Sequence, residues 1–97
     1  MTGKQRAYLR SLSNSLDTIV HIGKGGISEN VVKQTDEALT ARELVKGRVQ
    51  EASLLTAREA CEQLAEATNA EGIQVIGSRF VLYRANPKAT KITLPKG

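Results

Sequence analysis

Reactive and stacking side chains are scarce in this chain. Its 97 residues include one cysteine, two tyrosines, one phenylalanine and no tryptophan. The single cysteine, Cys61, excludes an internal disulfide, and no cysteine–histidine cluster has the spacing of a zinc site. With so few aromatic side chains, a broad exposed aromatic platform for stacking nucleic-acid bases is not expected.

Long apolar runs are absent too. No stretch approaches the roughly 18 consecutive apolar residues of a membrane-spanning helix. The opening segment, MTGKQRAYLR, is polar and unlike a signal peptide. We therefore expect a cytoplasmic monomer with no membrane partner. A chain of 97 residues with 40% apolar side chains predicts one domain, residues 1–97, with a Val/Leu/Ile/Ala core and no room for the large cavity of a big enzyme.

The charge balance is basic. Fourteen Lys and Arg residues face ten Asp and Glu residues, which gives a net charge of +4 and a pI near 9.5. Such a balance favours a polyanionic partner, although it also serves solubility alone. Basic residues crowd the two ends of the chain: Lys4, Arg6 and Arg10 near the start, and Arg79, Arg84, Lys88, Lys91 and Lys96 near the end. A localised basic patch and an ordinary solvated surface both fit this distribution.

The first half of the chain predicts helix, strand, turn and helix. Thr2 and Gln5 have the spacing of a capping box, so a helix is expected over residues 3–13. Residues 17–22 form a short apolar run typical of a buried strand, which stops at Gly23. Ser28 is a good N-cap for a second helix that extends to about Ala41.

The second half predicts strand, helix and a terminal hairpin. Residues 43–50 alternate imperfectly around Gly47, and a capping box at Thr56 opens a helix over residues 57–68. Gly77-Ser78 separates the β-rich runs 73–76 and 79–84 and is typical of a type II′ turn. This turn would place Val75 opposite Phe80 and Ile73 opposite Leu82, on one apolar face.

The element order αβαβαββ predicts an α/β fold of the two-layer α+β kind, with a four-stranded mixed sheet packed by helices. Residues 86–97 are expected to form a loosely attached basic tail, in which Ile92–Leu94 could add a short edge strand.

The turn Gly23-Lys24-Gly25-Gly26 is the most informative motif. Glycines allow positive φ angles and let another backbone approach without meeting a Cβ atom. The following helix N-terminus offers amides that favour an anion. The G-x-x-G pattern is the loop type with which KH domains clamp a nucleic-acid backbone, and it is neither a Walker loop nor a dinucleotide fingerprint. A tight connection that needs glycine for geometry alone is the alternative.

An ordered series of segments makes a family resemblance specific. The chain contains HIGKGGI at 21–27, LVKGRV at 44–49, AREA at 57–60 and VIGSRFVLYR at 75–84. This series resembles the YhbY family of small bacterial proteins, stand-alone forms of the CRM domain, which is named for chloroplast RNA splicing and ribosome maturation. The resemblance covers about residues 3–86. Gly47 departs from it, because family members usually carry a β-former there, so that strand is expected to be locally irregular.

The resemblance implies an RNA-binding fold similar to the C-terminal domain of bacterial translation initiation factor three. It also implies that the G-x-x-G loop contacts RNA, and that the protein associates with ribosomal RNA in precursors of the large ribosomal subunit. The loop residues carried over are Gly23, Lys24, Gly25 and Gly26. The basic candidates are Arg79 and Arg84, followed by Lys33, Lys4, Arg6 and Arg10, for which a solvated surface is the alternative.

Catalysis is not expected. His21 is the only histidine, and no nucleophile or acid stands at a motif spacing from it. Cys61 lies on an apolar helix stripe and is expected in the core. We therefore expect no enzyme activity, no cofactor and no metal.

Two rival hypotheses to RNA binding remain, a non-catalytic protein-binding adaptor and a small enzyme. Backbone amides and basic side chains without aromatics also predict weak selectivity among short RNAs.

Overall fold

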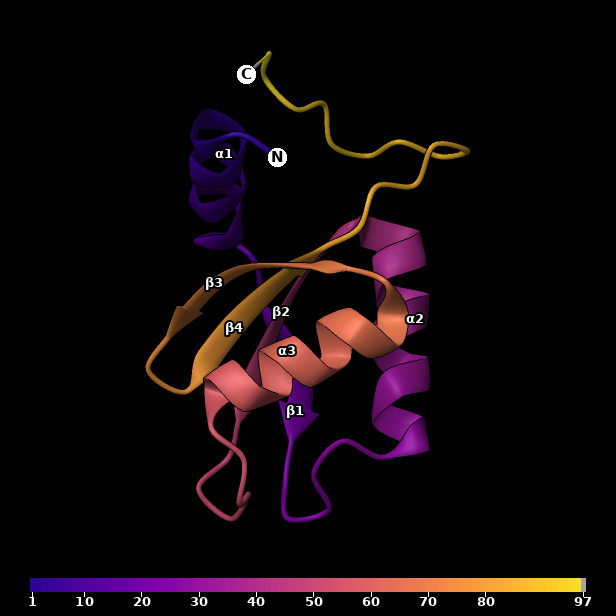
Figure 1. Ribbon diagram of the computed structural model, residues 1–97. Coiled ribbons are helices and arrows are strands. Elements are labelled where there is room, and N and C mark those ends of the chain that lie inside the picture. The colour runs from indigo at the N-terminus through magenta and orange to yellow at the C-terminus, as the bar shows by residue number, and fades with distance from the viewer. Residues whose placement is uncertain (97) are drawn as a thin grey trace.

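The computed structural model describes residues 1–96 and has the predicted element order (Figure 1). The seven elements are α1 (Gly3–Ser13), β1 (Thr18–Ile22), α2 (Glu29–Arg42), β2 (Leu44–Val49), α3 (Ala57–Thr68), β3 (Glu71–Ile76) and β4 (Arg79–Tyr83). Both predicted capping boxes form, at Thr2 with Gln5 and at Thr56 with Glu59, and Ser28 caps α2 as expected. These polar caps explain why the helix starts could be predicted closely.

The four strands form one mixed sheet in the order β1-β2-β4-β3. The β1–β2 pair is parallel, with α2 as the intervening segment, whereas β2–β4 and β4–β3 are antiparallel. Alternate side chains of a strand leave the sheet on opposite faces. One face packs on α2 and α3, and part of the other face packs on α1.

The larger core lies between the sheet and the pair α2 and α3. Its buried members are Val20, Ile22, Leu39, Val45, Val49, Ala57, Ala60, Cys61, Leu64, Phe80 and Leu82. Gly47 belongs to this face, because a Cβ atom built there would overlap the ring of Phe80, which is 1% exposed. A β-former at position 47 would therefore displace an aromatic side chain from the core.

The irregularity expected at Gly47 lies in the neighbouring strand. The β2–β4 register runs without a break through Gly47, which pairs with Phe80. The register of β1 shifts between Thr18 and Val20, opposite Lys46 and Gly47. One extra residue in β1 thus absorbs the irregularity, as in a β-bulge.

A smaller core lies under α1. Leu9 packs there with Leu44, Ile73, Val81 and Tyr83. This cluster corrects one predicted pair. Val75 does face Phe80 across the hairpin, and Gly77 has the positive φ (57°) that the turn requires. However, Leu82 pairs with Gly72, because the β3 register shifts between Gly72 and Gln74 and turns Ile73 to the α1 side of the sheet.

The tail is not loosely attached, which corrects another prediction. Residues 86–96 form no strand, yet Ile92 and Leu94 pack against the smaller core. The buried carboxylate of Glu43 accepts hydrogen bonds from the backbone N–H groups of Lys91 (2.6 Å) and Ile92 (2.8 Å). It also accepts one from the N–H of Asn86 at 2.5 Å.

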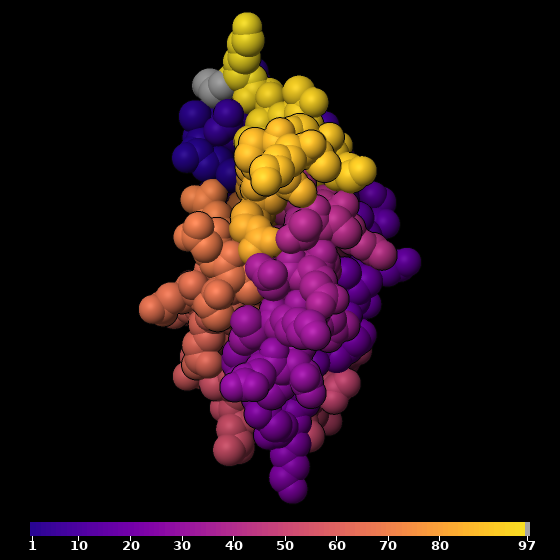
Figure 2. All heavy atoms as spheres, turned by 90° about the vertical axis from the view of Figure 1, so that its right-hand side faces the viewer, coloured from indigo at the N-terminus to yellow at the C-terminus, as the bar shows by residue number. Residues whose placement is uncertain are grey.

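The molecule is elongated, with principal extents of 40 × 26 × 21 Å. The tail and α1 lie together at one end of it, and the connection from β1 to α2 lies at the other (Figures 1 and 2). Because this connection holds the G-x-x-G motif, the motif is separated along the long axis from the basic residues of α1 and of the tail.

Candidate nucleic-acid interface

The Gly23–Gly26 segment is a closed turn with an exposed tip. The backbone N–H of Gly26 donates to the carbonyl of Gly23 at 3.0 Å, which leaves Lys24 and Gly25 at the central positions. Both central residues are exposed. The segment therefore exposes the cationic side chain of Lys24 next to the backbone of Gly25, which no side chain covers.

The fold accounts for the outer glycines of the turn and leaves the central one unexplained. Gly26 has a φ of 66°, a left-handed conformation that favours glycine. A Cβ atom at Gly23 would lie 3.3 Å from Oε1 of Gln50, which is a tight contact. At Gly25 the φ is not positive and a Cβ atom would meet nothing within 4 Å. Nothing in the fold requires glycine at position 25, whereas close approach of a ligand backbone would.

The helix N-terminus after the turn attracts anions less than the sequence suggests. Ile27 and Ser28 separate Gly26 from the first residue of α2. The Ser28 hydroxyl already accepts the N–H of Val31 at 3.3 Å, and the carboxylate of Glu29 stands in the first turn. A negative side chain at this position already satisfies much of the helix dipole.

A row of exposed polar side chains crosses the sheet beside the turn. His21 is in register with Arg48 on the parallel neighbour, and Arg48 is directly opposite Arg79 on β4. All three alternate with core residues of the α2–α3 face, so they project on the α1 side, where they are exposed. We call His21, Arg48 and Arg79 the cross-strand row.

The cross-strand row carries positive charge that the described part of the chain does not neutralise. Within residues 1–96 the ion pairs join Arg6 to Glu71 and Arg84 to Asp36, and neither involves Arg48 or Arg79. Like charges directly opposite each other in a sheet are destabilising. Lys46, one same-face position along β2, adds a third cation and donates from Nζ to the carbonyl of Ser13 at 3.4 Å. A bound polyanion would relieve this repulsion.

The structure brings Arg79 to the end of the molecule that holds the turn, but not the basic residues of α1. Lys4, Arg6 and Arg10 lie on α1 at the far end (Figure 1). The Arg6 guanidinium is also occupied, because it donates to the carbonyl of Gly72 at 2.7 Å.

Arg84 and Lys33 have different surroundings. The Arg84 guanidinium donates to Asp36 Oδ1 at 2.6 Å and to the carbonyl of Thr68 at 2.7 Å, so it ties α2 to the end of α3. This contact network explains Arg84 without any ligand. Lys33 is exposed in the second turn of α2, at the end of that helix nearest the glycine turn.

Sequence reasoning missed Arg48 and Lys46 and considered His21 only as a catalytic candidate. A sequence signal for these two cations does exist. Lys46 and Arg48 are two residues apart in LVKGRV, and this spacing puts both side chains on the same face of one strand. Their meeting with Arg79 depends on the strand order β1-β2-β4-β3, which the pattern of one strand does not contain.

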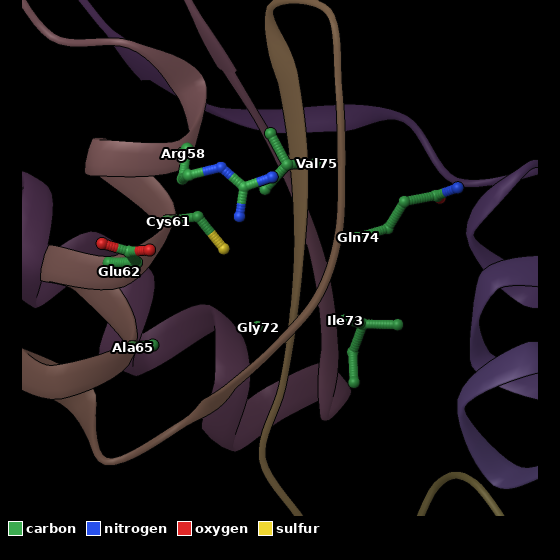
Figure 3. Close-up of a pocket in the computed structure, with 8 residues that line it drawn as sticks. All are labelled: Arg58, Cys61, Glu62, Ala65, Gly72, Ile73, Gln74 and Val75. Atoms are coloured by element: carbon green, nitrogen blue, oxygen red, sulfur yellow. The ribbon is translucent and has the colours of Figure 1, made fainter. Parts of the chain in front are cut away.

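A groove of about 330 Å³ between α3 and β3 shows no chemistry of its own (Figure 3). Cys61 lies in it beside Arg58 and Glu62, and this residue is only 4% exposed, which confirms the prediction of a core cysteine. Burial, with a smaller contribution from Glu62, raises the pKa of Cys61, so the unreactive thiol form is favoured.

Within residues 1–96 no three His, Cys, Asp or Glu side chains cluster as metal ligands. In the same range no helix is both long and apolar enough to span a membrane.

Known proteins resemble this chain over almost its whole length. The Bacillus subtilis (strain 168) protein named "Probable RNA-binding protein YqeI" is 38% identical over 95 residues, which cover 98% of this chain and 99% of that protein. A Haemophilus influenzae protein named "RNA-binding protein" is 33% identical over 96 residues, 99% of this chain and 96% of its own length.

Solved structures and family membership agree with this likeness. The solution structure of the hypothetical protein SAV1595 from Staphylococcus aureus superimposes with a TM-score of 0.81 at 48% identity and covers 98% of this chain and 99% of its own. The α+β fold with a four-stranded mixed sheet is therefore shared by a relative. Residues 1–84, which hold the glycine turn and the cross-strand row, match the CRS1 / YhbY (CRM) domain, so this chain belongs to that family.

Proposed function

We propose that this chain binds ribosomal RNA with the glycine turn and the cross-strand row, and that it associates with precursors of the large ribosomal subunit. In this proposal it acts in the cytoplasm as a monomer, without a cofactor and without catalysis. The observation that carries the proposal is Gly25, a glycine that the fold does not need, beside Lys24 in the turn that follows His21 of the cross-strand row. The RNA-binding names of the relatives support the class of ligand.

The turn and the row would hold the RNA backbone in complementary ways. At Gly25 a phosphate can approach the peptide closely because no Cβ atom intervenes. Lys24 acts on phosphate as a mobile point charge, whereas the planar guanidinium groups of Arg48 and Arg79 can donate two parallel hydrogen bonds each. Contacts of this kind fix the position of the RNA and leave its sequence unread.

The other basic candidates fall into three groups in this proposal. Lys33 supplies a contact beside the turn. Lys4 and Arg10 lie at the far end and reach only an RNA large enough to extend along the 40 Å axis. Arg6 and Arg84 hold the fold together and are left out of the interface.

The protein-binding adaptor is less well supported. Docking a partner strand needs free backbone groups on an edge strand, and β3 is one of the edges. Arg6 donates to the carbonyls of Gly72 (2.7 Å) and Ile73 (3.5 Å) on that strand. Part of the β3 edge is therefore already occupied.

Gly25→Asp tests the turn, and Gly3→Asp is its matched control. Both positions leave a Cβ atom free of contacts within 4 Å, and both changes add one negative charge, but Gly3 lies at the far end. We expect Gly25→Asp to weaken binding of a ribosomal RNA fragment at least tenfold at fixed salt, with a native far-UV circular dichroism spectrum. Gly3→Asp should bind as the wild type does. Equal affinities for all three folded proteins would remove the turn from the interface.

Sedimentation tests the proposed ribosomal partner. Cell extract is separated on a sucrose gradient at low salt and blotted for this protein. We expect the wild type in fractions that contain precursors of the large subunit, and Gly25→Asp in the light fractions. Wild-type protein confined to the light fractions would contradict the association with these particles while leaving RNA binding itself open to the affinity measurement.

A further inference from the structure

A small depression lies where the C-terminal end of α1 meets the uncovered part of the sheet. Its volume is about 140 Å³, and its lining includes Asn14 at the end of α1 and Lys46, Gln74, Ile76 and Arg79 on the strands. Sites for whole drug-sized ligands usually measure about 300–1,000 Å³. This depression is therefore of a size to take one flat ring.

The strand register explains why these side chains meet. Val81 pairs with Lys46 on one side and with Gln74 on the other, and Arg79 pairs with Ile76. These positions alternate with Phe80 and Val75, which belong to the opposite face. Figure 3 agrees, because the Gln74 side chain extends away from Cys61 and Arg58.

The chemistry of the lining is that of a site for reading hydrogen-bond donors and acceptors. The carboxamides of Asn14 and Gln74 each offer both donors and an acceptor, and neither side chain forms a hydrogen bond with another of residues 1–96. Ile76, which is 64% exposed, supplies an apolar surface beside them. Lys46 and Arg79 supply positive charge at the rim.

We propose that this depression binds one unpaired RNA base, whose edge is read by Asn14 and Gln74. The proposal rests on the RNA binding proposed above and adds a base-reading element to it. The ring would lie on Ile76, and the flanking phosphates would face Arg79 and Lys46. Asn and Gln carboxamides pair with the donor–acceptor pattern of adenine, so adenine is the preferred base.

A peptide is the alternative occupant, and the charges argue against it. Cations without ion-pair partners at the rim of a ring-sized depression match the phosphates on both sides of a single nucleotide. Tyr83, an aromatic side chain on this face, is 7% exposed and packs in the core under α1. In the lining of the depression, the carboxamides of Asn14 and Gln74 can both donate to and accept from the edge of a base.

The test compares an RNA of eight uridines with the same RNA carrying one central adenosine, at one salt concentration. The proteins are the wild type, the double variant Asn14→Ala/Gln74→Ala, Gly25→Asp, and Gln63→Ala. Gln63→Ala is the control, because Gln63 is an exposed glutamine on α3, outside the depression. Fluorescence anisotropy gives the affinities, and circular dichroism verifies folding.

We expect the wild type and Gln63→Ala to prefer the adenosine-containing RNA about fivefold, the lower end of what one good amide–base pair contributes. The double variant should bind both RNAs with the wild-type affinity for uridine RNA. Gly25→Asp should weaken both RNAs by a similar factor and keep the preference.

Three outcomes overturn the inference. In the first, the wild type binds both RNAs equally well. In the second, the double variant keeps the preference. In the third, a poly-glutamate peptide displaces the RNA and loses affinity in the double variant, which would assign the depression to a peptide. Failure of the wild type to bind any RNA would instead contradict the proposed function, so the two failures are distinguishable.

Discussion

Glu43 shows how a single residue can hold together parts of the chain that the sequence separates. It follows the last residue of α2 with a φ of 66°, and it is 1% exposed. Burial by itself would raise the pKa of this carboxyl group. Hydrogen bonds from the N–H groups of Asn86, Lys91 and Ile92, together with the charge of Lys91, outweigh burial and lower the pKa below its ordinary value of 4.5. The ionised form is therefore favoured in the folded state.

Glu43→Gln tests this carboxylate. A carboxamide has one accepting oxygen and brings an N–H group toward backbone donors, so some of these hydrogen bonds are lost. We expect the variant to lose about 1.5–3 kcal/mol of unfolding free energy at pH 7, the range for hydrogen bonds to a charged group. Urea denaturation followed by circular dichroism measures the loss.

The pH dependence has a definite sign. Because the pKa of Glu43 is lower in the folded state, its contribution to stability is complete above about pH 5 and declines as the pH falls through 4.5 and the lower folded-state value. The difference between wild type and Glu43→Gln should therefore shrink between pH 5 and pH 3. A difference that stays constant over this range would show that the ionised form has no special role.

At the scale of elements, the sequence predicted every helix and strand to within a few residues, because each start or stop has a local chemical signal. Thr2 and Thr56 cap helices, and the glycine turns end strands. The error in the β3 register is not local. Gly72 lies so close to Cys61 that a Cβ atom there would be 2.9 Å from the sulfur, and the register shift beside it turns Ile73 to the other face. Such a contact depends on how α3 sits on the sheet.

Arg84→Lys tests the joint between α2, α3 and β4. The guanidinium donates to two atoms of Asp36, to Thr40 Oγ1 at 2.8 Å and to the carbonyl of Thr68. A lysine ammonium is a single point and cannot reach all of these acceptors. We expect a loss of about 1.5–3 kcal/mol in unfolding free energy. RNA affinity of the folded variant should not change.

Arg79→Lys is the matched control for this joint. Arg79 is exposed and makes no ion pair within residues 1–96, so its replacement should change stability by less than about 0.5 kcal/mol. The same change should weaken RNA binding, because one lysine cannot make the paired hydrogen bonds of a guanidinium. If the folded Arg84→Lys variant bound RNA more weakly than the wild type does, Arg84 would belong to the interface after all.

At the scale of the whole molecule, half of the candidate interface could be predicted. The glycine turn is contiguous in sequence and carries its own signal. The cross-strand row could not be assembled from the sequence, because Arg48 and Arg79 meet only through the pairing of β2 with β4. The basic residues of α1 illustrate the converse, since charge of the same sign at the start of the chain lies at the far end of the fold.

Salt dependence tests this distribution of charge. If three to five phosphates contact the turn and the row, log K should fall against log salt with a slope of roughly −2 to −3.5, at ~0.7 per contact for single strands. Arg48→Ala/Arg79→Ala should make the slope shallower by roughly 1 to 1.4. Lys4→Ala/Arg10→Ala should leave it unchanged for a short RNA. A slope near zero in the wild type would favour the protein-binding adaptor.

The anchoring of the tail bears on where this domain ends. The match to the CRM domain covers residues 1–84, yet the donors that satisfy Glu43 come from residues 86, 91 and 92, and the Gln5 side chain donates to the carbonyl of Pro95 at 3.1 Å. A protein shortened after residue 84 would keep the buried carboxylate of Glu43 and lose its backbone donors, which is among the most costly changes a core can undergo. We therefore expect the smallest autonomously folding unit to extend past residue 84 and to include the backbone donors of the tail.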